Sequence, residues 1–72
     1  MNVKEFLSLD YRDQLQLINK SGQLKVSFVA NDYQFSLYKV KGFYVELKRH
    51  LRELFFETIT VMEYEDLPHQ YK

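Results

Sequence analysis

The stretch that decides the fold runs from Gln23 to Leu47 and reads QLKVSFVANDYQFSLYKVKGFYVEL. Apolar and polar residues alternate through most of it, as they do in strands that bury one face. The dipeptides Asn31-Asp32 and Lys41-Gly42 interrupt the alternation with residue types that favour tight turns. We therefore predict three consecutive antiparallel strands joined by short turns, which together form a β-meander.

The alternation also predicts which side chains share a face. We expect the apolar positions of all three strands to lie together beneath a helix, and the polar positions to form an opposite face open to water. Val29, Tyr38, Val40 and Tyr44 would then lie on this wet face. The predicted core combines helix and strand positions, namely Phe6, Tyr11, Leu15, Ile18, Leu24, Val26, Phe28, Phe35, Leu37, Phe43, Val45, Leu47, Ile59 and Val61.

A helix is predicted over residues 10–20, before the first strand. Tyr11, Leu15 and Ile18 recur at helical spacing and form one apolar stripe. Asp10 is a suitable N-cap, and Gly22 is expected to adopt the left-handed conformation just after the helix. Upstream, Asn2 can cap an earlier helical segment that breaks or bends near residues 8–10.

The segment after the third strand allows two interpretations. We predict a third strand over 43–49, a connection over 50–53 and a fourth strand over 54–62, because β-branched and aromatic residues dominate the last segment. The alternative is a short helix across 46–54, where leucines at helical spacing accompany good helix formers. The tail over 63–72 is acidic and is expected either to form one helical turn or to fray.

These elements predict an α+β fold in a single domain over residues 1–72. An N-terminal helix packs on one face of a three- to four-stranded antiparallel β-meander, and a short C-terminal helix is the remaining element. The helical part covers 1–22, the meander 23–62 and the acidic tail 63–72. Because a chain of this size buries only about 60% of the surface that it exposes when unfolded, one core is expected.

The composition limits the environment and the partners of the chain. Ten Lys and Arg residues balance ten Asp and Glu residues, so no overall charge attracts nucleic acid or an acidic membrane. The chain has no Cys, which favours a reducing compartment. We expect a cytoplasmic protein, since the start lacks the pattern of a secretory signal and no apolar run is long enough to span a membrane.

One segment resembles a known group of sequences. The run from Leu37 to Glu46, LYKVKGFYVE, is similar to a segment that recurs in small, uncharacterised bacterial proteins. Those proteins carry a helix, then a Gly-Phe-Tyr-Val-Glu hairpin, then an acidic tail around a Leu. The resemblance implies a bacterial cytoplasmic origin, and it implies no activity.

The sequence offers little catalytic or metal-binding chemistry. His50 and His69 stand nineteen positions apart and outside any metal-ligand signature. The acidic residues near Glu57 and Glu63 lack the order of a calcium loop, and no serine lies in a nucleophile motif. We therefore expect a protein that is not an enzyme and that uses no metal, cofactor or small-molecule substrate.

Surface contacts remain as the expected route to function. We predict a protein-interaction or regulatory module that binds a protein partner or a second copy through the wet sheet face or an edge strand such as 54–62. The alternative is nucleic-acid binding through the cations and tyrosines of the second hairpin. A third interpretation gives these cations no binding role, because Lys and Arg on a sheet also keep it soluble and protect its edges. The candidate interaction surface comprises Tyr38, Lys39, Lys41, Tyr44, Lys48, Arg49 and Arg52, with His50 beside them.

Overall fold

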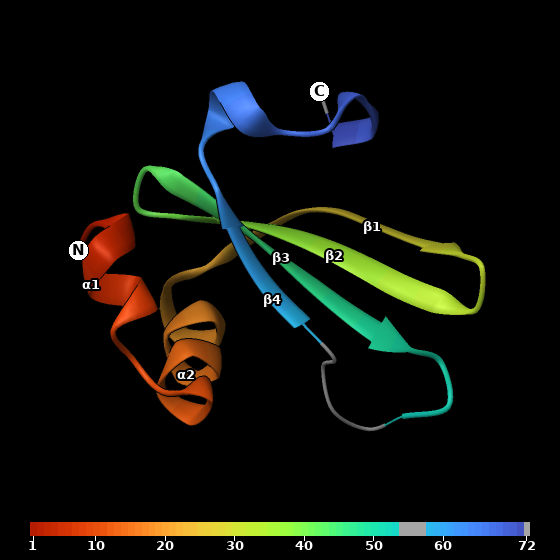
Figure 1. Ribbon diagram of the computed structural model, residues 1–72, viewed down its shortest axis with the longest axis horizontal. Coiled ribbons are helices and arrows are strands. Elements are labelled where there is room, and N and C mark those ends of the chain that lie inside the picture. Colours follow the sequence, from red (N-terminus) through yellow and green to blue (C-terminus); the bar gives the residue numbers. More distant parts are fainter. Residues whose placement is uncertain (54–57, 72) are drawn as a thin grey trace.

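The computed structural model describes residues 1–53 and 58–71 and confirms the α+β meander. Its four strands are antiparallel and lie side by side in chain order, β1-β2-β3-β4 (Figure 1). The elements in chain order are α1 (Val3–Leu7), α2 (Tyr11–Ser21), β1 (Gln23–Ala30), β2 (Tyr33–Val40), β3 (Phe43–His50), β4 (Thr58–Met62) and two 3₁₀ turns, η1 (Tyr64–Asp66) and η2 (His69–Tyr71).

Side-chain caps start both helices, as the sequence predicts. The Asn2 side chain accepts a 2.8 Å hydrogen bond from the Glu5 amide, and the Glu5 carboxylate accepts one from the Asn2 amide, which completes a capping box. Asp10 accepts a hydrogen bond from the Asp13 amide at the start of α2. The break between the helices near Ser8 is also confirmed.

The prediction that Gly22 adopts a left-handed conformation is wrong. Its φ of −78° is one that any residue adopts, so the left-handed region is not used. Glycine is needed because a Cβ at this position would lie 2.5 Å from the carbonyl oxygen of Ile18. This close approach lets α2 pass directly into β1.

Both hairpin turns contain two residues with positive φ. Asn31 and Asp32 have φ of 54° and 68°, and Lys41 and Gly42 have φ of 43° and 98°. Two consecutive positive φ values belong to type I′ turns, whose twist matches that of the flanking strands. Each hairpin is therefore closed by a two-residue loop, and the loop length fixes the register.

The register shows that the predicted face of β2 is wrong. Val40 pairs with Phe43 and Tyr38 with Val45, so even-numbered residues of β2 share a face with odd-numbered residues of β3. Leu37 instead pairs with Glu46 and lies on the opposite face. Since side chains alternate strictly along a strand, a two-residue loop forces this change of parity.

A β-bulge at Lys25 divides β1 between the two faces. Val26 and Phe28 pair with Leu37 and Phe35, on the face away from the helices, whereas Leu24 pairs with Tyr38 on the helix face. The extra residue at the bulge shifts the side-chain direction by one position. The predicted core, which placed the apolar residues of β1 on one face with those of β3, is therefore wrong for this strand.

The first apolar cluster lies between the helices and the sheet. Phe6 from α1 is fully buried, and its ring meets Phe43 edge-on at 5.5 Å between centroids. Ile18 is the buried residue of α2, and Val40 is fully buried although the sequence placed it on the wet face. Tyr11, at the first position of α2, is 45% exposed, so its assignment to the core is also wrong.

A second apolar cluster covers the face that we expected to be wet. Leu67 and Tyr71 from the C-terminal segment are buried against Leu37, with Val26 and Phe28 packed beside them. The Tyr71 ring lies 5.7 Å from that of Phe28. The expectation of a wet face is therefore wrong over this area, because the parity of β2 and the bulge in β1 deliver apolar side chains to it. Both faces of the sheet are covered in part.

In the ambiguous segment over 46–54, residues 46–50 are strand and residues 51–53 form the turn that follows it. β3 continues through His50, so a helix across 46–50 is wrong. β4 begins at Thr58, and the predicted strand positions 54–57 lie outside the described residues. Among the residues that the structure describes, no helix is long and apolar enough to cross a membrane.

Candidate functional site

The predicted interaction surface is divided between the two faces of the sheet. Tyr38 lies on the helix face, where it packs against the first cluster. Tyr44 lies on the opposite face and contacts the ring of Tyr64 at 6.2 Å between centroids. The expectation that both tyrosines flank the cations on one face is wrong, again because of the parity of the hairpin.

Two of the predicted cations, Lys48 and Arg49, have partners inside the fold for their charged groups, and a third, Arg52, is held by its backbone. The ammonium of Lys48 lies 4.3 Å from the centre of the Tyr33 ring. Arg49, on the other face, donates a 2.6 Å hydrogen bond to the Gln34 side chain and another to the backbone oxygen of Glu53. The backbone amide of Arg52 donates to His50 Nδ1 in the turn after β3. The first two interactions hold their side chains against the sheet.

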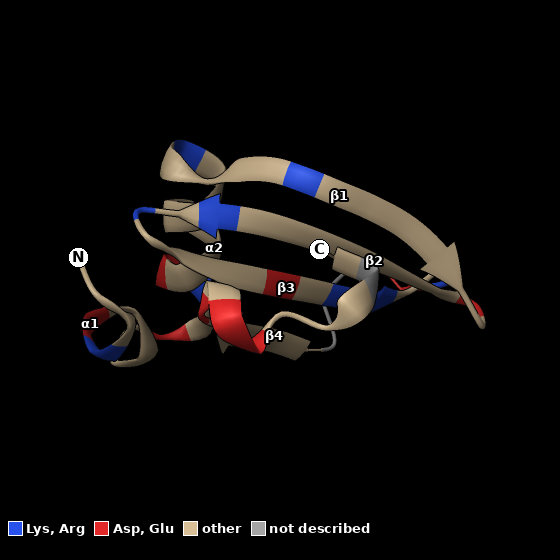
Figure 2. Cartoon of the chain, turned by 90° about the horizontal axis from the view of Figure 1, so that it is seen from above, with Lys and Arg blue, Asp and Glu red and all other residues tan. Residues whose placement is uncertain are grey.

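The remaining two cations lie toward the other end of β3. Lys39 pairs with Tyr44, and Lys41 lies in the β2–β3 turn. The five strand residues 43–47 separate that turn from Lys48, which puts Lys48 about 20 Å from the turn. Figure 2 shows basic segments at both ends of the long strands with an acidic segment between them on β3. The structure therefore does not bring the predicted residues together into one patch.

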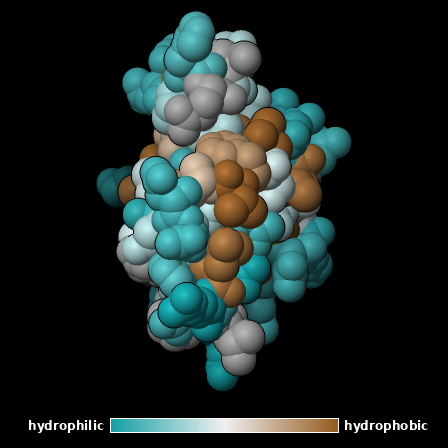
Figure 3. All heavy atoms as spheres, turned by 90° about the vertical axis from the view of Figure 1, so that its right-hand side faces the viewer, coloured by the Kyte–Doolittle hydropathy of each residue, from teal (hydrophilic) through white to brown (hydrophobic). Residues whose placement is uncertain are grey.

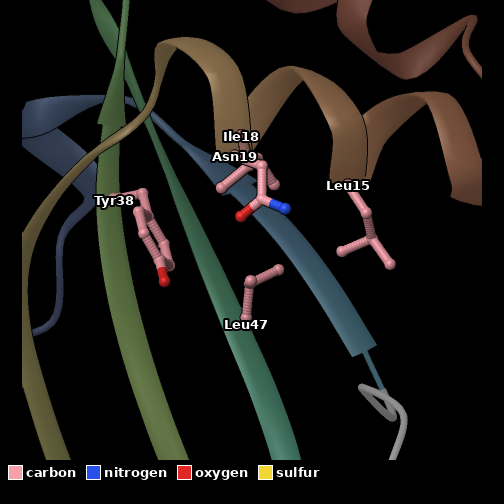
Figure 4. Close-up of a pocket in the computed structure, with 5 residues that line it drawn as sticks. All are labelled: Leu15, Ile18, Asn19, Tyr38 and Leu47. Carbon is pink, nitrogen blue, oxygen red and sulfur yellow. The ribbon is translucent and has the colours of Figure 1, made fainter.

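A shallow cavity of about 130 Å³ lies on the helix face beside α2 (Figure 4). Its polar groups are the amide of Asn19 and the hydroxyl of Tyr38, and the remaining walls are aliphatic. A cavity of this kind accepts one apolar side chain more readily than a polar substrate. It is lined by Leu15, Ile18, Asn19, Tyr38 and Leu47.

The outer edge of β1 is the longer of the two sheet edges as the structure describes them. β1 is eight residues long, contains no proline and lies first in the strand order. Ala30 and Tyr33 close the two-residue loop, so Ala30, Phe28 and Val26 direct their amide and carbonyl groups toward β2. Ser27 and Val29 direct theirs outward. This edge offers an unpaired ladder to another strand.

Apolar side chains accompany the open edge. Leu24 is 54% exposed and Val29 is 59% exposed, whereas Val45 in the middle of the sheet is fully buried. Leu51 lies near the same end, because its amide donates a hydrogen bond to Asp32 in the β1–β2 turn. Figure 3 looks onto this end and shows apolar surface in the middle with hydrophilic margins. An added strand would therefore find apolar contacts beside the free backbone groups.

The charge around the start of β1 is positive. Neither β1 nor β2 contains Asp or Glu, and each contains one lysine, Lys25 in β1 and Lys39 in β2. Lys20 in the last turn of α2 adds a third cation immediately before β1. All three lysines are exposed, and no ion pair joins them to another residue within 1–53 or 58–71. The beginning of β1 is thus bordered by unpaired positive charge.

Sequence reasoning missed this edge because it buried Leu24 and sought the open strand at 54–62. One signal was present: from Lys20 to Lys41 the chain has four lysines and a single acidic residue, Asp32 in a turn. This asymmetry is invisible in the net charge of the whole chain. β4 is the other edge strand, as expected, but it is shorter than β1, and its Ile59 and Val61 pack against the first cluster.

Comparison with known proteins adds no relative. No protein-family model, no curated protein and no solved structure matches the chain. Over residues 1–53 and 58–71, no three His, Asp or Glu side chains are grouped so that they could hold a metal ion. The function is therefore inferred from the geometry of the open β1 edge.

Proposed function

We propose that this chain is a non-enzymatic interaction module that captures an extended segment of a protein partner by strand addition at β1. The observation that carries the proposal is the eight-residue edge of β1, with its outward amides at Ser27 and Val29 and its exposed side chains at Leu24 and Val29. In strand addition, main-chain hydrogen bonds supply affinity, and side-chain contacts on the two faces supply specificity.

The rest of the molecule supports this use of β1. The type I′ turn holds β1 firmly against β2, and the stacked rings of Phe28 and Phe35, 5.2 Å apart, tie the two strands together. A rigid edge loses little conformational entropy when a partner adds to it. The cavity beside Tyr38, whose strand partner is Leu24, provides a further apolar contact for the partner near the beginning of β1.

Cytoplasmic action is part of the proposal. The absence of Cys suits a reducing compartment. The similarity of the run from Leu37 to Glu46 to small bacterial proteins supports a bacterial origin.

The test is a peptide array of random eight-residue segments probed with three forms of the chain. Val29→Pro removes the outward amide without breaking a bond to β2, and Val29→Ala removes the same side chain but keeps the amide. We expect peptides that the wild-type chain retains to survive Val29→Ala with modest weakening and to be lost with Val29→Pro. Circular dichroism and thermal unfolding verify that both variants fold.

Three outcomes would overturn the proposal. These are an array in which no peptide is retained, equal retention by Val29→Pro and Val29→Ala, and tighter binding of a single-stranded oligonucleotide than of any peptide. The oligonucleotide is measured at about 50 mM salt, where contacts to phosphates are strong. That third result would favour the cations of the predicted patch over the β1 edge.

A further inference from the structure

The open edge of β1 is chemically divided along its length. Near the β1–β2 turn the edge is apolar, with Val29 exposed and Leu51 nearby. Near α2 it is bordered by the exposed ammonium groups of Lys20, Lys25 and Lys39. Lys25 stands at the bulge, and Lys39 is the penultimate residue of β2, paired with Gln23 at the start of β1.

Among the described residues, the acidic side chains lie away from the start of β1, and Asp32, in the β1–β2 turn, stands at the other end of the strand. Asp10 caps the start of α2 and Asp13 lies in its first turn, at the far end of that helix from Lys20. Glu46 lies on β3 and accepts the hydrogen bond of the Tyr71 hydroxyl. Figure 2 shows basic segments on α2, β1 and β2 with no acidic segment between them, and acidic segments on β3 and in the C-terminal segment. Among the described residues, therefore, no carboxylate is placed beside Lys20, Lys25 and Lys39 at the start of β1.

We propose that the occupant of the β1 edge is an extended segment whose one half is apolar and whose other half is acidic. This inference rests on the proposed function and names the partner's chemistry. The apolar half lies along Ser27 to Ala30, and the acidic half lies beside Lys20, Lys25 and Lys39. Carboxylates there gain attraction to three cations that have no described partner.

A second copy of the chain is a weaker match for these charges. In a β1–β1 pairing about a twofold axis the two strands are antiparallel, so the start of each β1 lies toward the β1–β2 turn of the other copy. The carboxylate that this turn offers to the lysines is that of Asp32. A segment with several carboxylates therefore complements Lys20, Lys25 and Lys39 better than a second copy does.

The test uses three fluorescein-labelled peptides that differ only in charge. Each has an alternation of two valines and two threonines, followed by four glutamates, four glutamines or four lysines. Fluorescence anisotropy measures the Kd with the full chain. We expect the glutamate peptide to bind about tenfold more tightly than the glutamine peptide at low salt, and this ratio to shrink at about 0.5 M salt, where screening is strong.

Charge variants locate the effect on the surface. Lys25→Gln combined with Lys39→Gln is expected to weaken the glutamate peptide about fivefold and to leave the glutamine peptide unchanged. Lys4→Gln on α1 is the control, since Lys4 is also exposed but belongs to the first helix. Loss of affinity in the control as large as in the double variant would overturn the inference.

The outcomes separate the inference from the proposed function. Equal Kd values for the glutamate and glutamine peptides, or tighter binding of the lysine peptide, would overturn the acidic partner and leave strand addition standing. Strand addition itself fails if no peptide binds. It also fails if bound peptide does not slow amide hydrogen exchange at Ser27 and Val29. This measurement uses the wild-type chain and so does not depend on whether a variant folds.

Discussion

The hydroxyl of Tyr71 donates a 2.7 Å hydrogen bond to the Oε2 atom of Glu46 and so joins the C-terminal segment to the middle of β3. Tyr71 is only 8% exposed, and its ring packs on Phe28 of β1. One side chain therefore links three parts of the sheet face that lies away from the helices. The link explains why an acidic tail that could have frayed lies in a defined place.

This link makes stability sensitive to alkaline pH. Burial, and secondarily the hydrogen bond and negative charge of Glu46, raise the pKa of Tyr71 far above the ordinary tyrosine value of about 10. Above about pH 10 the unfolded chain therefore loses a proton that the folded chain keeps. We expect the free energy of unfolding to be unaffected by this group below that pH and to fall by up to about 1.4 kcal/mol per pH unit above it.

Urea unfolding between about pH 8 and pH 11 measures this slope. Tyr71→Phe is expected to be destabilised at neutral pH by about 1 to 2 kcal/mol, because it loses a hydrogen bond to a carboxylate, and to show a smaller alkaline decline. Tyr38→Phe is the control, since the Tyr38 hydroxyl has no hydrogen bond to the described residues. The account fails if Tyr71→Phe and the wild-type chain decline equally.

Leu67 is the second anchor of the C-terminal segment, with 6% of its surface exposed. Leu67→Ala is expected to lower the free energy of unfolding by about 2 to 3 kcal/mol, through lost burial and the space left behind. Leu7→Ala makes the same chemical change where 59% of the side chain is exposed, and it should cost less than about 0.5 kcal/mol. Equal costs in denaturant titrations would show that the segment does not pack on the sheet.

The β2–β3 turn can be improved. Lys41 has a φ of 43°, in a region where asparagine is tolerated better than lysine, and Gly42 follows it. Lys41→Asn creates the Asn-Gly pair preferred in type I′ turns and is expected to stabilise the fold by about 0.5 kcal/mol. Lys39→Asn removes the same charge within β2 and should give no gain. A lower urea midpoint for Lys41→Asn would contradict this description of the turn.

Gly22 is required by contact and not by its backbone angles. A Cβ there would meet the Ile18 carbonyl oxygen at 2.5 Å, so Gly22→Ala is expected to cost about 2 kcal/mol. Ser21→Ala, at the neighbouring exposed position, should change stability by less than about 0.5 kcal/mol. Thermal unfolding of the two variants compares them directly, and a neutral Gly22→Ala would refute the close approach.

Local signals predicted the elements well because each depends on neighbours in the chain. Asn2 and Asp10 start their helices as caps, and the Lys41-Gly42 turn forms where the alternation breaks. The interaction surface was not predictable in this way. Tyr38 and Tyr44 belong to one hairpin, yet they lie on opposite faces, and two of the predicted cations are held by Tyr33 and Gln34.

The amino-acid order alone settled that this chain forms helices, then a meander, since periodicity, caps and turn residues act over a few positions. The tertiary structure decided which side chains of each strand lie on which face of the sheet. It also decided that Leu67 and Tyr71 cover the face away from the helices. The reason is that a two-residue loop and a single bulge at Lys25 each change side-chain parity, and their effect appears only when strands pair. The open, lysine-bordered edge of β1 follows from the same pairing.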